Sequence, residues 1–378
     1  MPDAGDMIPL SDVAGAVKLG QVFRRTTSSY KFLWFLSILD LVASRDLQIG
    51  KALRLSMPEI VALMIAKAWV PTQRFRLNFG HWDKMTQRIE ELKSLKIVRL
   101  DAADDEHSVI RALNSLKSDQ KAKYLEEIYK PLTRYVPQHF LSPWSGSAEK
   151  DDANWAPYRR VGHSDEIEIS YPWAQYLQEN YQVLKGFALW KFAGYLEDRN
   201  TNVPGLNQRL EFTGARGSLS VPTEFWRSYL INGKVKTDIY GEPIVESDGS
   251  FSFHLDHFLP WHFVMHDQIW NLSPVNSNLN SSKSDRIPQV DQFIRQFALQ
   301  QQKLLHFHLQ REQQEKTEEY FYAQYENFFG CEVSVLTEMP ETSLITLFSD
   351  RFQPMERTAL NMGFERWDRV MATASIGN

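Results

Sequence analysis

The chain has 378 residues, 43% of them hydrophobic, which is enough for two or three domains with well-packed cores. Its formal net charge of −5 argues against broad non-specific adhesion to nucleic acid, which normally needs a basic surface. The sequence contains one cysteine, Cys331, which excludes intrachain disulfides and cysteine-based zinc sites and favours a reducing compartment. We therefore expect a globular protein of the cytoplasm.

The longest apolar run does not predict a membrane span. Residues 32–43 are interrupted by Asp40 and are fewer than the roughly 20 residues that cross a bilayer. Residues 1–10 lack the basic flank and apolar stretch of a secretory signal. The sequence therefore predicts neither a membrane segment nor a signal peptide.

Most of the chain has the apolar periodicity of helices, and serines stand at the expected N-caps of the first two. The predicted helices cover residues 30–43, 60–69, 82–95, 121–135, 171–199, 290–329, 342–350 and 356–363. Residues 141–154 are rich in Ser, Gly, Pro and Asp and are predicted to be a linker.

These features predict four regions. They are a helical N-terminal domain at 1–145, a helical region at 155–235, a small mixed core at 236–290 and a helical C-terminal region at 291–378. The N-terminal helices suit a DNA-binding module, a docking surface or a scaffold, and the sequence leaves these three roles open.

The mixed core carries the strand signals. Aromatic and polar residues alternate over residues 250–257, which predicts a half-buried strand, and residues 270–275 predict a second short strand that is broken at Pro274. Residues 276–280 are predicted to be a loop, and residues 281–287 to form one or two helical turns. The predicted order is strand, loop, strand, helix.

Four polar residues of this core have a spacing that phosphodiester hydrolysis can use. Asp256 and His257 are adjacent, Asn271 follows fourteen positions after the histidine (271 − 257), and Asn280 follows nine positions later (280 − 271). Carboxylate and amide oxygens are hard ligands, so Asp256 and Asn280 are candidate ligands of Mg²⁺ or Mn²⁺. His257 is the candidate general base. Because only one carboxylate is evident, we expect one metal ion, and we expect Asn271 to fix the loop geometry.

Other polar residues of the core are weaker candidates. Lys283 and Arg286, in the predicted helical turns, are candidate phosphate contacts, although a solvated side chain explains Lys283 equally well. His254 shares a strand face with Asp256 and is expected to be partly exposed. His262 and His266 fall in a loop and are expected to be surface residues.

The motif Asp-His, followed by Asn-Leu-Ser-Pro and Asn-Ser-Ser-Lys-Ser, resembles that of HNH endonucleases in the His-Asn-Asn variant. This resemblance implies a ββα-metal fold with Asp256 and Asn280 as metal ligands, His257 as general base and Asn271 as the asparagine that orients the base. The spacing is similar to that of the HNH domain of RNA-guided CRISPR effectors. The segments DHFLPW and WNLSP resemble bacterial HNH proteins found near phage-defence or restriction genes.

The sequence departs from many of these relatives in one respect. They carry a Cys-x-x-Cys pair in the hairpin before the Asp-His strand, where it holds a structural zinc, whereas residues 237–241 are Thr-Asp-Ile-Tyr-Gly. We therefore expect no structural zinc. Packing of Ile239, Tyr240 and Ile244 is expected to hold the hairpin in its place.

Together these features predict a mainly α-helical α+β protein with a small ββα-metal core embedded in helical N- and C-terminal regions. The expected function is a Mg²⁺- or Mn²⁺-dependent endonuclease that nicks DNA, with antiphage defence or restriction as its biology. DNA is the expected partner, with proteins of a defence complex or a second copy as further partners. The alternatives are a nuclease subunit that is inhibited until a partner activates it, and a DNA-binding regulatory protein with a silent core.

Overall fold

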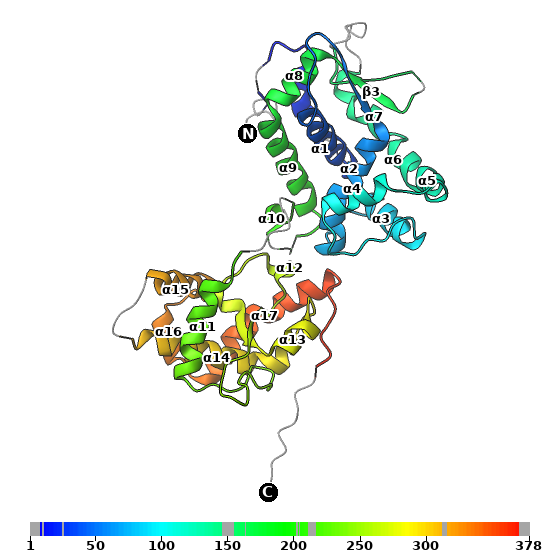
Figure 1. Ribbon diagram of the computed structural model, residues 1–378. Helices are drawn as coiled ribbons and strands as arrows, with labels where there is room; N and C mark the ends of the chain where they lie inside the picture. Colours follow the sequence, from blue (N-terminus) through cyan, green and yellow to red (C-terminus); the bar gives the residue numbers. More distant parts are fainter. Residues whose placement is uncertain are drawn as a thin grey trace. The chain divides into compact units, whose positions relative to one another are not determined.

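The computed structural model describes residues 8–9, 11–24, 26–145, 155–162, 164–201, 203, 205–210, 217–311 and 316–369. These residues are mainly helical, with a few short antiparallel strands, so the predicted fold class is confirmed (Figure 1). Their contacts divide the chain into two compact units, Met1–Gly214 and Ala215–Asn378. No helix in the described part of the chain is both long and apolar enough to span a bilayer.

The first unit is built around long apolar helices. Its helical segments are η2 (Ala16–Gln21), α1 (Tyr30–Ala43), α2 (Met57–Trp69), η3 (Val70–Arg74), α3 (Met85–Ser94), α4 (Glu106–Asn114), α5 (Ser118–Tyr124), η4 (Leu125–Tyr129), α6 (Lys130–Thr133), α7 (Val136–Phe140), η5 (Ser142–Trp144), α8 (Tyr171–Glu179), α9 (Tyr181–Glu197) and α10 (Leu206–Leu210). Helix α1 has the predicted bounds, and it is buried along most of its length because most of its side chains are apolar.

Residues after the predicted linker return to the same unit. Strand β3 (Glu166–Ile169) pairs antiparallel with β1 (Leu53–Ser56) and with β2 (Arg159–Arg160). The hydroxyl of Tyr158 accepts a hydrogen bond from Trp34 Nε1 at 2.9 Å and donates one to the Pro137 carbonyl at 2.7 Å. The division between the units therefore falls after α10, not within the predicted linker, of which residues 146–154 lie outside the described residues.

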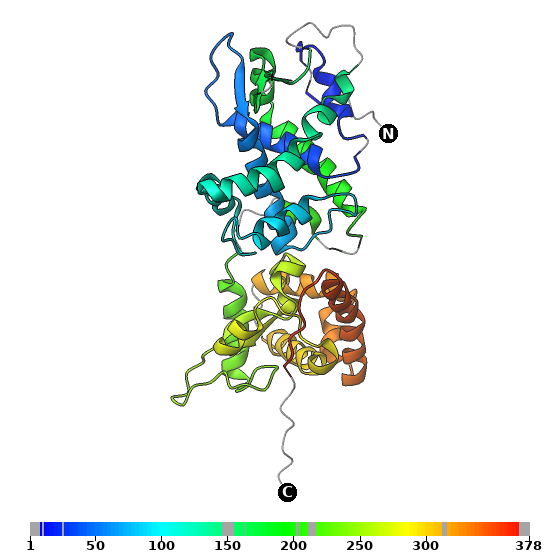
Figure 2. The same ribbon diagram turned by 90° about the vertical axis from the view of Figure 1, so that its right-hand side faces the viewer.

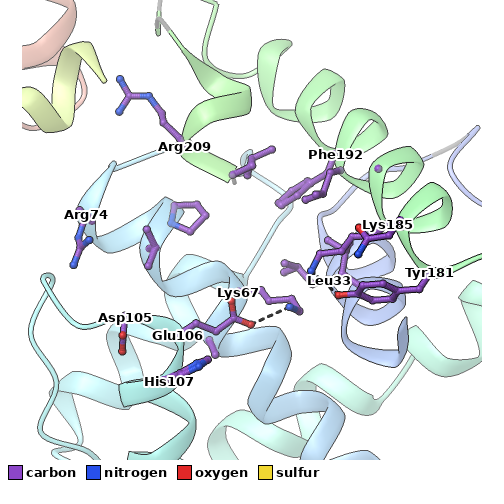
Figure 3. Close-up of a pocket in the computed structure, with 18 residues that line it drawn as sticks. Leu33, Lys67, Arg74, Asp105, Glu106, His107, Tyr181, Lys185, Phe192 and Arg209 are labelled. Carbon is purple, nitrogen blue, oxygen red and sulfur yellow. Dashed lines mark hydrogen bonds and ion pairs between the residues drawn. The ribbon is translucent and has the colours of Figure 1, made fainter. Parts of the chain in front are cut away.

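A pocket of about 720 Å³ lies among α1, α2, α4 and α9 of the first unit (Figure 3). Two lysines of its lining pair with carboxylates. Lys67 forms ion pairs with Asp40 and Glu106, and Lys185 lies 3.2 Å from Asp40 and donates to the Tyr181 hydroxyl at 2.8 Å. The network joins the four helices. Each of these lysines and carboxylates has a partner of opposite charge, so none of them is partly buried without a counter-ion.

The second unit contains the predicted mixed core and the C-terminal helices that surround it (Figures 1 and 2). Its elements are α11 (Ser220–Asn232), β4 (His254–His257), α12 (Trp261–Val264), η6 (Ile269–Asn271), β5 (Leu272–Val275), α13 (Ser277–Lys283), α14 (Val290–Leu309), α15 (Lys316–Phe329), α16 (Val333–Glu338) and α17 (Glu341–Asn361).

Several predicted helices are divided or joined differently in the structure. The helix predicted at 171–199 is interrupted at Asn180, and the one at 290–329 is two helices, α14 and α15. Conversely, the two helices predicted at 342–350 and 356–363 are one, α17, which continues through Pro354. Burial of apolar α17 side chains against α14 offsets the backbone hydrogen bond that a proline removes.

The C-terminal helices hold β4 and β5 through aromatic and amide side chains. Just after β4, Phe258 stacks on Phe297 of α14 at 4.3 Å, and Trp270 stacks on Phe328 of α15 at 3.6 Å between ring centroids. Gln301 of α14 donates to the carbonyl of Leu272 at 2.8 Å. The core is therefore fixed by helices that follow it in the sequence, and its geometry depends on them.

Candidate active site

Strands β4 and β5 and helix α13 form a ββα unit. The strands are antiparallel, with Asp256 opposite Ser273 and His257 opposite Leu272. The prediction that Pro274 breaks the second strand is wrong, because Pro274 lies inside β5. Each strand of a two-stranded sheet has a free edge where a missing N–H is tolerated.

Helix α13 begins four residues before the predicted helical turns. The side chain of Asn276 is the N-cap and accepts a hydrogen bond from the Asn278 amide at 3.0 Å. The prediction of a loop at 276–280 is therefore wrong, and Asn280 stands on a helix. Asn280 and Lys283 are three residues apart, so they share one face of α13.

This face of α13 lies against β4. The ammonium of Lys283 is 2.8 Å from Asp256 Oδ2 and donates to the His257 carbonyl at 2.6 Å. One turn earlier, Asn280 Nδ2 is 3.5 Å from Nδ1 of His254, which shares a strand face with Asp256. The structure thus brings the predicted residues of the strand and the helix together.

The two predicted phosphate contacts are in different surroundings. The side chain of Lys283 has no exposed surface, so its ammonium lies inside the site and not in solvent. Arg286 is about half exposed, donates to the Ser282 carbonyl at 2.8 Å and lies 3.5 Å from Glu365. Arg286 can therefore meet a phosphate at the surface, whereas Lys283 acts on Asp256 within the protein.

The ring of His257 is buried and is held by a carboxylate that sequence reasoning missed. His257 Nε2 is 2.9 Å from Oδ1 of Asp267, which lies between α12 and η6. When the ring is neutral and Nε2–H donates to this carboxylate, Nδ1 is the basic nitrogen. The available signal was a carboxylate ten positions after the histidine (267 − 257), in the segment that leads to Asn271.

Asn271 is fully buried and braces the chain that follows β4. Its side chain accepts a hydrogen bond from the Leu259 amide at 2.9 Å and donates to the Leu259 carbonyl at 2.8 Å. Its own carbonyl accepts from the Phe258 amide at 2.7 Å. These bonds fix the turn directly after His257.

The exposure of the three histidines near His257 agrees only in part with the prediction. His254 is exposed, as expected for the strand. His262 and His266, predicted as surface residues, are partly buried because α12 and η6 pack on the helical body. His262 Nδ1 is 2.7 Å from Asp285. Burial, together with nearby His257, lowers the pKa of His266 to about 4, so this ring stays neutral at physiological pH.

The hairpin before β4 is held by packing and by one buried carboxylate. Ile239, Tyr240 and Ile244 are buried, as predicted. Asp238 is also buried and accepts hydrogen bonds from the backbone amides of Tyr240, Glu242 and Asn276, at 2.9, 2.9 and 3.0 Å. Asp238 therefore joins the hairpin to the start of α13 by hydrogen bonds.

The donor set of the site fits a hard divalent ion. Lys283 contacts one oxygen of Asp256, which leaves the other oxygen and the amide oxygen of Asn280 as candidate ligands. Within the described ranges, no three His, Cys, Asp or Glu side chains form a metal cluster. Mg²⁺ and Mn²⁺ suit such a sparse site, because Mg²⁺ usually keeps several water ligands and takes substrate phosphate as another.

Residues 241–289, which include β4, β5 and α13, match the family model of the HNH endonucleases. The chain carries an HNH endonuclease domain. Its resemblance to this family is thus confirmed for the segment that contains all six predicted site residues. No curated protein and no solved structure is significantly similar to the chain. The HNH domain places the protein among the nucleases.

Proposed function

We propose that the chain is a divalent-metal-dependent DNA endonuclease whose HNH domain hydrolyses one phosphodiester bond per catalytic event. The observation that carries this proposal is the contact of α13 with β4, which groups Asp256, His257, Asn280 and Lys283 in one ββα unit. A catalytically inactive HNH domain would not need these four side chains together. DNA is favoured as the substrate by the resemblance to DNA-cutting HNH domains.

In this proposal His257 is the general base. Nδ1 removes the proton from the attacking water while Asp267 accepts the hydrogen bond from Nε2–H and stabilises the imidazolium that forms. Asn271 holds the turn that follows His257 and so fixes the position of the ring. Asp267 and Asn271 act through His257 and are positioning residues.

The metal ligands in this proposal are Asp256 and Asn280. A bound divalent ion would stabilise the negative charge that develops on the phosphate and on the leaving oxygen. Lys283 neutralises one oxygen of Asp256 and orients the carboxylate toward the site from its buried position. A single site cuts one strand, and a break of both strands then needs two copies of the chain or repeated nicks.

The metal dependence is tested with supercoiled plasmid. Purified protein with Mg²⁺ or Mn²⁺ is expected to convert supercoiled plasmid to the open-circular form, and EDTA in excess to stop the conversion. Asn280→Ala should raise the metal concentration for half-maximal rate, because the ion loses a protein ligand. Cleavage that persists in EDTA would contradict the metal assignment. Cleavage only in the presence of a partner protein would favour the inhibited-subunit alternative.

Asp267→Asn is expected to lower the cleavage rate by roughly 10- to 100-fold while KM stays near the wild-type value. The amide keeps an oxygen that can accept from Nε2–H but loses the charge that stabilises the imidazolium. The matched control is Asp285→Asn. Asp285 forms a similar pair with His262, in which its Oδ2 lies 2.7 Å from Nδ1 of the imidazole. Equal losses of rate in the two variants, or a change confined to KM, would exclude the positioning role of Asp267.

We further propose that the protein acts in the cytoplasm in antiphage defence or restriction. The compartment is supported by the single cysteine of the sequence. The biological role is supported by the resemblance of the DHFLPW and WNLSP segments to defence-associated HNH proteins.

A further inference from the structure

The segment that follows α17 returns to the HNH domain. The amide of Ile287 donates to the Glu365 carbonyl at 2.8 Å, and the amide of Trp367 donates to the Ile287 carbonyl at 2.7 Å, which makes a short parallel bridge. Trp367 is buried, with its ring 4.8 Å from that of Tyr240 in the hairpin. Residues 364–369 are therefore fixed along the end of α13, although they lie outside the family match at 241–289.

This contact creates a groove of about 500 Å³, the arginine groove, which is lined by Ser282, Arg286 and residues 365–369. Its three arginines come from two distant parts of the sequence: Arg286 from the end of the HNH domain, and Arg366 and Arg369 from the C-terminal segment. Their side chains are 48%, 46% and 24% exposed. Two acidic residues, Glu365 and Asp368, also line the groove, so its lining carries one net positive charge.

Each arginine of the groove is paired with a carboxylate. Arg286 lies 3.5 Å from Glu365, Arg366 lies 3.6 Å from Glu356, and Arg369 is bonded to Glu242. The pair of Arg286 and Glu365 is exposed on both sides, so it contributes little to stability, and screening by salt weakens it further. A phosphate can therefore replace Glu365 at Arg286, since this carboxylate is 72% exposed and free to turn into solvent.

We propose that the arginine groove binds backbone phosphates of the DNA that flank the bond to be cut. The inference rests on the proposed nuclease function. Arg286 stands three residues beyond Lys283, so the groove begins where the candidate active-site face of α13 ends. Guanidinium groups match the geometry of phosphate oxygens, and they are concentrated here on a chain whose net charge is −5. The C-terminal segment thus completes the substrate surface of the HNH domain.

A competing explanation is that the arginines only hold the C-terminal segment in place through their ion pairs. The two explanations differ in what removal of a carboxylate does. If Arg286 binds phosphate, Glu365→Gln frees the arginine and strengthens DNA binding. If the arginine only fastens the segment, Glu365→Gln breaks the same bond as Arg286→Gln and weakens binding to a similar degree.

The experiment measures binding of a fluorescent DNA duplex by anisotropy at 50–200 mM KCl, with full-length His257→Ala protein so that the duplex is not cut. Arg286→Gln and Arg366→Gln are each expected to weaken binding roughly fivefold or more and to lower the slope of log K against log salt by about 1. Glu365→Gln is expected to tighten binding. The control is Arg295→Gln, which removes an arginine that pairs with Glu341 outside the groove and should change neither value.

Three outcomes overturn the inference, and they can be told apart. If the parent protein binds the duplex and the wild type cuts plasmid, but the groove variants keep the parental affinity and salt slope, the groove is not a phosphate site and the nuclease proposal stands. The same holds if Glu365→Gln weakens binding as Arg286→Gln does. If the parent protein does not bind duplex and the wild type does not cut it, both proposals fail.

Discussion

His257→Ala is expected to lower the single-turnover rate of duplex cleavage by about 10²- to 10⁴-fold, because the attacking water loses its general base. Binding of DNA should be retained, since the ring is buried beside Asp267 and its loss leaves the exposed arginines in place. The rate is measured by following a labelled strand of a short duplex with enzyme in excess.

The matched control for this substitution is His262→Ala. His262 lies on α12 of the same domain and is also paired with a carboxylate, Asp285, but neither is placed at the reacting phosphate. Its removal should change the cleavage rate by less than about tenfold. Equal rate losses at His257 and His262 would mean that the first substitution acts by disturbing the fold.

Asp256→Ala is expected to abolish cleavage and also to destabilise the HNH domain by about 3–5 kcal/mol. The first effect follows from the loss of a metal ligand. The second follows because the fully buried ammonium of Lys283 loses its counter-ion and keeps only the His257 carbonyl as acceptor. The double variant Asp256→Ala/Lys283→Met removes both charges, so it should regain most of the stability and none of the activity.

Amide hydrogen exchange of β4 and β5 measures this destabilisation within the second unit by itself, which global unfolding of a two-unit chain does not. Asp248→Ala, in the same hairpin region but fully exposed, is the control and should exchange as the wild type does. Unchanged exchange in Asp256→Ala would show that Lys283 is not held by this carboxylate.

Local sequence patterns were sufficient to predict the HNH motif, the two strands and the burial of the hairpin residues Ile239, Tyr240 and Ile244. These features depend on the alternation of apolar and polar residues and on the spacing of polar side chains within about fifty residues. The start of α13 was missed, although Asn276 is a typical N-cap, because Pro274 and the polar residues after it also fit a loop.

Features that depend on distant contacts were not predictable in the same way. Asp267 stands ten positions after His257, but this spacing alone does not show that its carboxylate faces the ring. The burial of Lys283 likewise depends on how α13 lies against β4. The return of residues 364–369 to Ile287 joins segments almost eighty positions apart (365 − 287 = 78), which one sequence does not reveal. The continuation of α17 through Pro354 likewise depends on packing against α14, not on helix propensity.

We propose that the HNH domain of this chain hydrolyses DNA with His257 as its base and a divalent ion at Asp256 and Asn280. The most direct test of this proposal is the conversion of supercoiled plasmid to the open-circular form by wild-type and His257→Ala proteins, side by side in Mg²⁺. We expect the wild type to accumulate open circles and His257→Ala to leave the plasmid supercoiled over the same time. Open circles formed at the same rate by both proteins would contradict the proposal.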